Sequence, residues 1–344
     1  MSINFKSTVI IIALLFSCLY VFSSAVYATE DNVNVKDKSI HWPLPPAKAR
    51  FAYVKSVYGE SRQQDGGIFS GLKRFLFGDD IPNHFSRPHD IAVSDTGLMV
   101  VTDPGAAGFH ILNTESDGYH FIQQLDETRL ISPIGAAFTD EDEILITDSL
   151  AKTIYRVSSE GEKLGQITDK ALQRPTDIAV HPLTHDIYVL DTLGHNIHVY
   201  DSSGKKRMRF GKRGNQPGEF NFPTHLTFSR KGELYVTDTM NFRVQVFDQK
   251  NQPMAHFGSL GDRLGEFSKP KGIALDEQDN IYIVDSHFDH LLVYDKNGRF
   301  LLPIGGNGTG PGLFNLPTGV TISQHYIYII DSYNRRVQIL KRLG

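Results

Sequence analysis

Six copies of one short unit fill most of this chain, and this repetition constrains the fold more than any other feature of the sequence. A proline opens each copy, and the prolines recur at intervals of 42 to 48 residues. An aspartate follows each proline after 14 to 16 residues. The prolines are Pro88, Pro133, Pro175, Pro223, Pro270 and Pro317, and the aspartates are Asp103, Asp148, Asp191, Asp238, Asp285 and Asp331. Such units stack on one another because none buries its apolar face alone.

The fifth unit shows the organisation within each copy. It holds four β-rich runs, separated by turn residues, at 270–276, 280–286, 291–295 and 299–304. This pattern predicts one four-stranded antiparallel sheet per unit. Six such units, from about residue 85 to the end, predict an all-β six-bladed β-propeller.

The two ends of the repeat array indicate how the ring closes. The sixth unit stops at Gly344 after three predicted strands, so its outer strand is missing. Residues 50–59, upstream of the first unit, read as a β-strand that ends in Tyr58-Gly59. We expect this N-terminal strand to complete the last blade, which places the propeller at residues 50–344 and removes an open edge.

A recurring frame of glycines and aromatic residues separates the later units. It occurs at 210–220, 257–267 and 304–314. Glycine at fixed offsets permits positive φ or close chain approach, and the aromatic rings can pack between neighbouring sheets. We interpret these segments as connectors between blades.

The repeat motif itself resembles a known family. The pattern Pro-x-Gly-Ile-Ala-x-Asp, then Asn-x-Tyr-x-x-Asp and Asn-x-Arg-Val-Gln-Val, is clearest at 223–248 and 317–340. It resembles the NHL repeat of six-bladed β-propellers, including exported bacterial ones. The resemblance implies an architecture and says little about activity.

The repeated aspartates and asparagines are interpreted as structural. A carboxylate after the second strand of every blade accepts backbone N–H bonds and fixes a turn. A ligand site, in contrast, needs groups that converge at one place. Three asparagines in the following turns are predicted to adopt positive φ, namely Asn196, Asn241 and Asn334.

The first 28 residues predict export. Lys6 precedes an apolar run over 9–22, and small residues lead to Ala28. This is typical of a signal peptide cleaved after Ala28, with an uncleaved anchor as the alternative. We therefore expect a periplasmic or envelope-associated protein. Residues 29–49 are read as a tether and a Pro-rich entry.

The lone cysteine, Cys18, lies in this leader, so the mature chain would hold no thiol nucleophile, thiolate metal site or disulfide. The formal net charge is −4, which gives no global attraction to nucleic acid. A basic cluster at 205–213 is interpreted as a solvated strand. No nucleic-acid partner is predicted.

A segment between the closing strand and the first unit has helical spacing. Apolar residues at 68, 69, 72, 75 and 76 predict a short amphipathic helix over 67–78. Its apolar face is expected to pack on the propeller, and contact of residues 68–77 with a partner or a membrane is the alternative.

The candidate ligand-binding residues follow from the repeat register. In a propeller, the inner strands converge on a central channel, so the two residues after each repeat proline are expected to surround one opening. The polar residues at these positions are His89, Asp90, Thr176, Asp177, Thr224, His225, Lys271 and Thr318.

One further resemblance bears on metal binding. The stretch Arg87-Pro88-His89-Asp90-Ile91 resembles a motif of peptidyl-hydroxyglycine amidating lyase, a six-bladed propeller in which such a histidine ligates zinc. The resemblance implies a metal ligand at His89, and His225 is a second candidate, offset by one position. The chain has no third histidine at an equivalent start, although three ligands are needed.

Two function classes follow. The first is an exported, non-enzymatic binding or scaffolding propeller, monomeric, that presents its channel mouth to a peptide, glycan or protein partner. A rigid ring would bind such a partner with little ordering cost. The second is a metal-dependent lyase or lactone hydrolase with zinc or calcium, in which Asp90 or Asp177 would act as base. No cofactor is predicted for the first class.

Overall fold

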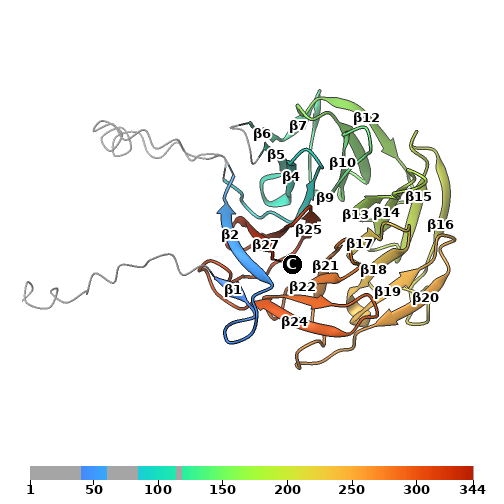
Figure 1. Ribbon diagram of the computed structural model, residues 1–344. Helices are drawn as coiled ribbons and strands as arrows, with labels where there is room; N and C mark the ends of the chain where they lie inside the picture. Colours follow the sequence, from blue (N-terminus) through green and yellow to red (C-terminus); the bar gives the residue numbers. More distant parts are fainter. Residues whose placement is uncertain (1–39, 60–83, 114–117, 344) are drawn as a thin grey trace, which may run out of the picture. The chain divides into compact units, whose positions relative to one another are not determined.

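The computed structural model describes residues 40–59, 84–113 and 118–343, and these form a closed ring of six antiparallel sheets (Figure 1). The inner strands lie around the centre in Figure 1 and the fourth strands lie toward the rim. The all-β six-bladed propeller predicted from the repeat is therefore confirmed. The predicted signal peptide at 1–28 and helix at 67–78 lie outside the described residues.

Each of the first five blades consists of four strands in sequence order from the channel outward. The first blade contains β3 (Asp90–Val93), β4 (Leu98–Asp103), β5 (Gly108–Asn113) and β6 (Tyr119–Ile122). The second contains β9 (Pro133–Phe138), β10 (Ile144–Asp148), β11 (Thr153–Val157) and β12 (Lys163–Thr168). The third contains β13 (Pro175–Val180), β14 (Ile187–Asp191), β15 (Asn196–Tyr200) and β16 (Lys206–Phe210).

The fourth and fifth blades repeat this arrangement. The fourth contains β17 (His225–Phe228), β18 (Leu234–Asp238), β19 (Arg243–Phe247) and β20 (Pro253–Phe257). The fifth contains β21 (Pro270–Leu275), β22 (Ile281–Asp285), β23 (His290–Tyr294) and β24 (Phe300–Gly305). Smaller elements are the hairpin of β7 (Gln124–Leu125) and β8 (Thr128–Arg129), and two 3₁₀ turns, η1 (Pro104–Ala106) and η2 (Thr239–Asn241).

The sixth blade joins the two ends of the propeller. Its own strands are β25 (Val320–Ser323), β26 (Tyr326–Asp331) and β27 (Arg336–Arg342). The fourth strand is β2 (Phe51–Val57), which pairs antiparallel with β27 from Phe51 opposite Arg342 to Val57 opposite Val337. This confirms the predicted closing strand. A short strand, β1 (His41–Trp42), then pairs with β2 as a fifth strand inside the predicted Pro-rich entry.

Apolar side chains fill all six interfaces between neighbouring blades. Six buried clusters occur, and each combines residues of two adjacent blades. In the cluster that joins the first blade to the last, Phe85 and Met99 pack with Ile330 and Val337. This interface has a buried apolar cluster like the other five, and such packing makes the ring rigid around its channel.

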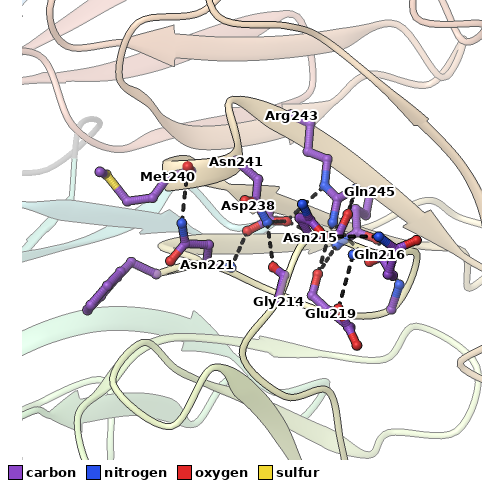
Figure 2. Close-up of polar contacts among 12 residues, drawn as sticks. Gly214, Asn215, Gln216, Glu219, Asn221, Asp238, Met240, Asn241, Arg243 and Gln245 are labelled. Atoms are coloured by element: carbon purple, nitrogen blue, oxygen red, sulfur yellow. Dashed lines mark hydrogen bonds and ion pairs between the residues drawn. The ribbon is translucent and has the colours of Figure 1, made fainter.

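The repeat aspartates organise each blade, as the fourth blade shows (Figure 2). The buried carboxylate of Asp238 accepts hydrogen bonds from the backbone N–H of Asn221 at 2.7 Å and from the side chains of Asn241, Arg243 and Gln245. Arg243 also donates to backbone oxygens of the preceding glycine-rich connector, at Asn215, Gln216 and Glu219. The carboxylate therefore ties a turn, a connector and the start of an inner strand together.

The predicted role of the asparagines in these turns is wrong. Positive φ falls on the adjacent residues, at 53° for His195 and 54° for Phe242 and Arg335. The amides of Asn241 and Asn334 donate to the repeat aspartates at 2.8 and 2.9 Å instead. The asparagine thus supplies the hydrogen-bond donor that the carboxylate needs. The residue next to it adopts the positive φ that reverses the backbone.

The glycine frames are connectors, as predicted. A short parallel bridge joins residues 213 and 220, 260 and 267, and 307 and 314 within the three frames. Phe220, Phe267 and Phe314 are completely buried. None of the residues that the structure describes forms a helix with the length and hydropathy that crossing a lipid bilayer requires.

Candidate functional site at the channel mouth

A cavity of about 420 Å³ occupies the end of the channel at which the inner strands begin. It is lined by side chains that flank the repeat prolines and by the turns between second and third strands. The lining comprises Arg87, His89, Pro104, Gly105, Ser132, Ile134, Arg174, Lys269, Lys271, Ser286, Leu316, Thr318, Ser332 and Tyr333. Four of these residues are basic and none is acidic, so the mouth is strongly cationic.

The repeat aspartates position three of the four basic residues. Each basic residue directly precedes a repeat proline, and its backbone N–H donates to the buried aspartate of its own blade. The distances are 2.8 Å from Arg87 to Asp103, 2.8 Å from Arg174 to Asp191 and 3.0 Å from Lys269 to Asp285. The backbones are thereby fixed while the side chains extend into the mouth. The same carboxylates also cap their own turns, as the sequence predicts.

Three of the four cations of the mouth, Arg87, Arg174 and Lys269, act on the fourth, Lys271. Burial, followed by the positive charges of Lys269, Arg174 and Arg87, lowers the pKa of Lys271 from 10.5 to about 8. None of the four makes an ion pair with a carboxylate among residues 40–59, 84–113 and 118–343. An anion placed among them would relieve this mutual repulsion.

One of these cations also bridges the ring closure. The guanidinium of Arg87, in the first blade, donates to the hydroxyl of Tyr333 in the sixth blade at 2.7 Å. It lies 5.2 Å from the centre of the same ring. The contact joins two residues that line the cavity and restrains the Arg87 side chain there.

Two histidine rings separate the mouth from a deeper layer of the channel. His89 lines the mouth cavity, and His225 lines a second cavity of about 250 Å³. Their rings stack nearly parallel, with centres 5.7 Å apart. Burial, followed by the charge of Lys271, lowers the pKa of His89 to about 3, so its imidazole is neutral near pH 7.

The deeper layer contains two buried carboxyl groups, Asp90 and Asp177. Asp90 accepts a hydrogen bond from the N–H of Ala136 in the next blade at 3.1 Å, and Asp177 accepts one from Leu226 at 2.7 Å. Burial raises the pKa of Asp90 to about 6, and burial with the neighbouring Asp90 charge raises that of Asp177. Each carboxyl group thus connects two blades.

The structure divides the predicted channel residues between two layers and a set of hydrogen bonds within single blades. His89, Lys271 and Thr318 line the mouth, whereas Asp90, Asp177 and His225 line the deeper cavity. Thr176 and Thr224 line neither, and their hydroxyls bond to Thr192 and Thr239 at 2.5 and 2.7 Å. Ligand binding by these two threonines stays a prediction.

Sequence reasoning missed the residues directly before the prolines. Arg87, Arg174 and Lys269 occupy that register in three of the six units, and all three are exposed. Reading the repeat one position further toward the N-terminus shows this basic bias. The pattern was available in the sequence, but its convergence at one cavity required the ring geometry.

The two candidate metal ligands, His89 and His225, do not have the arrangement that zinc needs. A tetrahedral ion requires nitrogens that converge on one point, whereas these rings are stacked face to face. Within the described parts of the chain, no group of three or more His, Cys, Asp or Glu side chains is placed to hold a metal ion.

Fold and site together define a closed six-bladed propeller with a cationic channel mouth. A family model described as 6-bladed beta-propeller matches residues 168–254, 226–295 and 266–339, which together span half of the chain. The chain belongs to this family. A comparison with curated protein sequences gives no significant match.

Several solved structures share the fold. Virginiamycin B lyase from Staphylococcus aureus has a TM-score of 0.57 and 16% identity, over 76% of this chain and 97% of its own. An auxiliary nutrient binding protein from Bacteroides ovatus has a TM-score of 0.59 and 15% identity, over 76% of this chain and 70% of its own. A Bacteroides thetaiotaomicron protein of unknown function has a TM-score of 0.60 and 15% identity, over 76% and 71%.

Proposed function

We propose that this chain is an exported, non-enzymatic binding protein whose channel mouth takes an anionic ligand. The observation that carries the proposal is the cavity of about 420 Å³ that is lined by four basic residues and no acidic one. Holding four like charges together is unfavourable for the unliganded protein. Anionic ligand groups would make charge-assisted hydrogen bonds to the guanidinium and ammonium groups.

The rigidity of the ring supports a binding role. Arg87, Arg174 and Lys269 extend from backbones that buried carboxylates hold in place. A ligand would therefore meet donors that are already positioned, and little conformational entropy would be lost on binding. A binding function is also consistent with the auxiliary nutrient binding proteins that share the fold.

The deeper layer supports a non-enzymatic interpretation. Asp90 and Asp177 are buried carboxyl groups that line the deeper cavity, and both accept backbone N–H bonds from a neighbouring blade. We therefore assign them to the stability of the ring, rather than to the general-base role that the alternative enzyme class would give them.

Titration calorimetry with citrate at low ionic strength tests the site. The variant Arg174→Glu/Lys269→Glu changes two exposed side chains and should weaken citrate binding about 100-fold or more, because two attractions become repulsions. The matched control is Lys205→Glu/Arg209→Glu, which changes one exposed side chain just before β16 and one on that exposed strand. It has the same net charge change and should bind within about twofold of the unmodified protein. Equal binding by both variants, or no binding of citrate, phosphate or sulfate, would overturn the proposal.

Export requires a separate test. The proposal rests on the leader at residues 1–28. Expression of the full chain followed by cell fractionation should recover it outside the cytoplasm, with Thr29 as the N-terminal residue. Recovery in the cytoplasm with Met1 retained would contradict export and leave the anion site unaffected.

A further inference from the structure

We infer that the ligand of the cationic mouth is an acidic segment of a partner protein, with apolar side chains on either side of its acidic residues. This inference rests on the proposed function and concerns the surface around the cavity. Five apolar side chains are unusually exposed there, and we call them the apolar collar. They are Ile131, Leu150, Leu193, Met240 and Tyr333, with exposed fractions of 52%, 64%, 43%, 49% and 51%.

The collar lies on the same face of the ring as the mouth. Four of its members follow the second strand of their blades, in the turn that leads to the third strand. Each of these four turns donates a backbone hydrogen bond to the segment just before a repeat proline, at 2.9 to 3.1 Å. The pairs are Ser149 to Ser132, Thr192 to Arg174, Met240 to Asn221 and Tyr333 to Asn315. The fifth member, Ile131, precedes a proline segment directly, and its N–H donates to Asp148.

The collar extends recognition beyond a small anion. A compact ligand such as citrate would occupy the cavity and leave Leu150, Leu193 and Met240 in water. These three side chains occupy the same position of the turn in the second, third and fourth blades, so their exposure is a repeated feature. Exposed apolar side chains that are grouped on a surface mark interaction sites. A ligand that uses both features must carry negative charge at its centre and apolar groups at its periphery.

The shape of the face favours a polypeptide over a lipid bilayer. One of the four charges is recessed, because Lys271 is partly buried in the cavity whereas the other three basic side chains are exposed. A bilayer surface is nearly flat, so its phosphates would not reach that depth while acyl chains contacted the collar. A polypeptide can direct acidic side chains inward and apolar side chains outward from one backbone, as peptide ligands commonly do in grooves.

The composition of the collar disfavours a glycan. Tyr333 is its only aromatic member, and it is already engaged by Arg87. The other members are aliphatic or a thioether. Such side chains match the leucine, valine or methionine of a protein better than the faces of sugar rings, which favour aromatic partners.

Fluorescence anisotropy with labelled synthetic peptides tests the inference. The first peptide carries two central glutamates with leucines on both sides, the second has serines in place of the leucines, and the third has glutamines in place of the glutamates. The full-length protein should bind the first peptide about tenfold or more tightly than the second, because buried leucines add apolar contact. The third peptide should bind weakest.

Matched variants separate the collar from other exposed apolar side chains. Leu150→Ser/Leu193→Ser/Met240→Ser should reduce affinity for the first peptide to that for the second and leave citrate binding unchanged. The control Leu164→Ser/Met208→Ser/Met254→Ser changes side chains of similar exposure on the outer strands β12, β16 and β20, and should have no effect. All of these side chains are exposed, so both variants should fold.

The outcomes separate the two proposals. If the first and second peptides bind equally and Arg174→Glu/Lys269→Glu abolishes both, the inference fails and the anion site stands. If vesicles of anionic phospholipid bind through the collar and the peptides do not, the inference also fails. If peptide and citrate binding are both unaffected by Arg174→Glu/Lys269→Glu, the proposed function itself fails.

Discussion

The two layers of the channel differ although Lys271 of the mouth and the aspartates of the deeper layer are only one position apart in the repeat. The mouth contains Lys271 and three further basic side chains that no carboxylate neutralises among the residues described. The layer below contains Asp90 and Asp177, buried and bonded to the backbone of neighbouring blades. The cations of the mouth have no carboxylate partner, whereas the carboxyl groups of the deeper layer are buried and hydrogen-bonded.

One position of the repeat can therefore stabilise the ring while a neighbouring position binds a ligand. A buried polar group must have its hydrogen bonds satisfied within the protein, and the Asp90 and Asp177 carboxyls meet that need. A binding site requires polar groups whose hydrogen-bonding capacity is still free. Substitution in the deeper layer should therefore change mainly the stability of the protein. Substitution in the mouth should change mainly its affinity for the ligand.

The largest effect should come from truncation in the deeper layer. Asp177→Ala leaves the N–H groups of Leu226 and Ile178 without their acceptor, which should lower the free energy of unfolding by about 2 to 3 kcal/mol. Lys269→Ala at the mouth should change it by no more than about 0.5 kcal/mol. Urea denaturation measures both values. Similar losses in the two variants would remove the distinction between the layers.

The second effect is a pH dependence of stability that originates in the deeper layer. Asp90 has a pKa of about 6 in the folded protein against an ordinary value of 3.8, and the pKa of Asp177 is also raised. Between these values the folded state retains a proton that the unfolded state releases. This contribution to stability is therefore greatest at low pH, and it should fall by about 2 to 3 kcal/mol as the pH rises from about 4 to about 7.

Removal of one carboxyl group should flatten that profile. Asp177→Asn abolishes one of the two titrations and the repulsion between the pair, so urea denaturation across this range should show a smaller decline. Asp262→Asn changes an exposed aspartate and should keep the slope of the unmodified protein. A steeper decline in Asp177→Asn than in the unmodified protein would contradict the assignment.

The smallest effect should be a pH dependence of affinity at the mouth. The pKa of Lys271 is about 8, so its ammonium is mostly charged at pH 7. It loses its proton as the pH rises through about 8. Citrate affinity should therefore fall by up to about tenfold from pH 7 to pH 9. Lys271→Arg should remove most of this fall because the guanidinium stays protonated. Calorimetry at constant ionic strength measures it, and an equal fall in both proteins would exclude Lys271 as its cause.

The fold could be predicted from the sequence because each of its signals repeats. The spacing of prolines and aspartates defined the blades, and the Tyr58-Gly59 ending identified the closing strand. The placement of positive φ in the turns could not be predicted from Asn241 or Asn334, because the buried aspartates compete for the asparagine side chains. Which side chains bind the carboxylate depends on how the turn and the third strand pack beside it, and this packing is visible only in the folded blade.

The candidate site was predictable only in part. Register alone identified His89 and Lys271 as channel residues, but it treated consecutive positions as one ring. In the structure, Asp90 and His225 belong to a deeper cavity than Lys271 does. The depth of each side chain depends on the tilt and start of its inner strand, which the repeat pattern does not specify. Arg174 lies outside the predicted register altogether.

The most direct test of the anion site is the titration of Lys271 itself. Protein labelled at the lysine ε-carbons can be followed by NMR across pH, with the Lys271 signal assigned from its absence in Lys271→Arg. The pKa of Lys271 should be about 8 without ligand and should rise by about one unit or more when citrate is bound, because the anion favours the charged ammonium. A Lys271 titration that citrate leaves unchanged would show that no anion binds beside this ammonium.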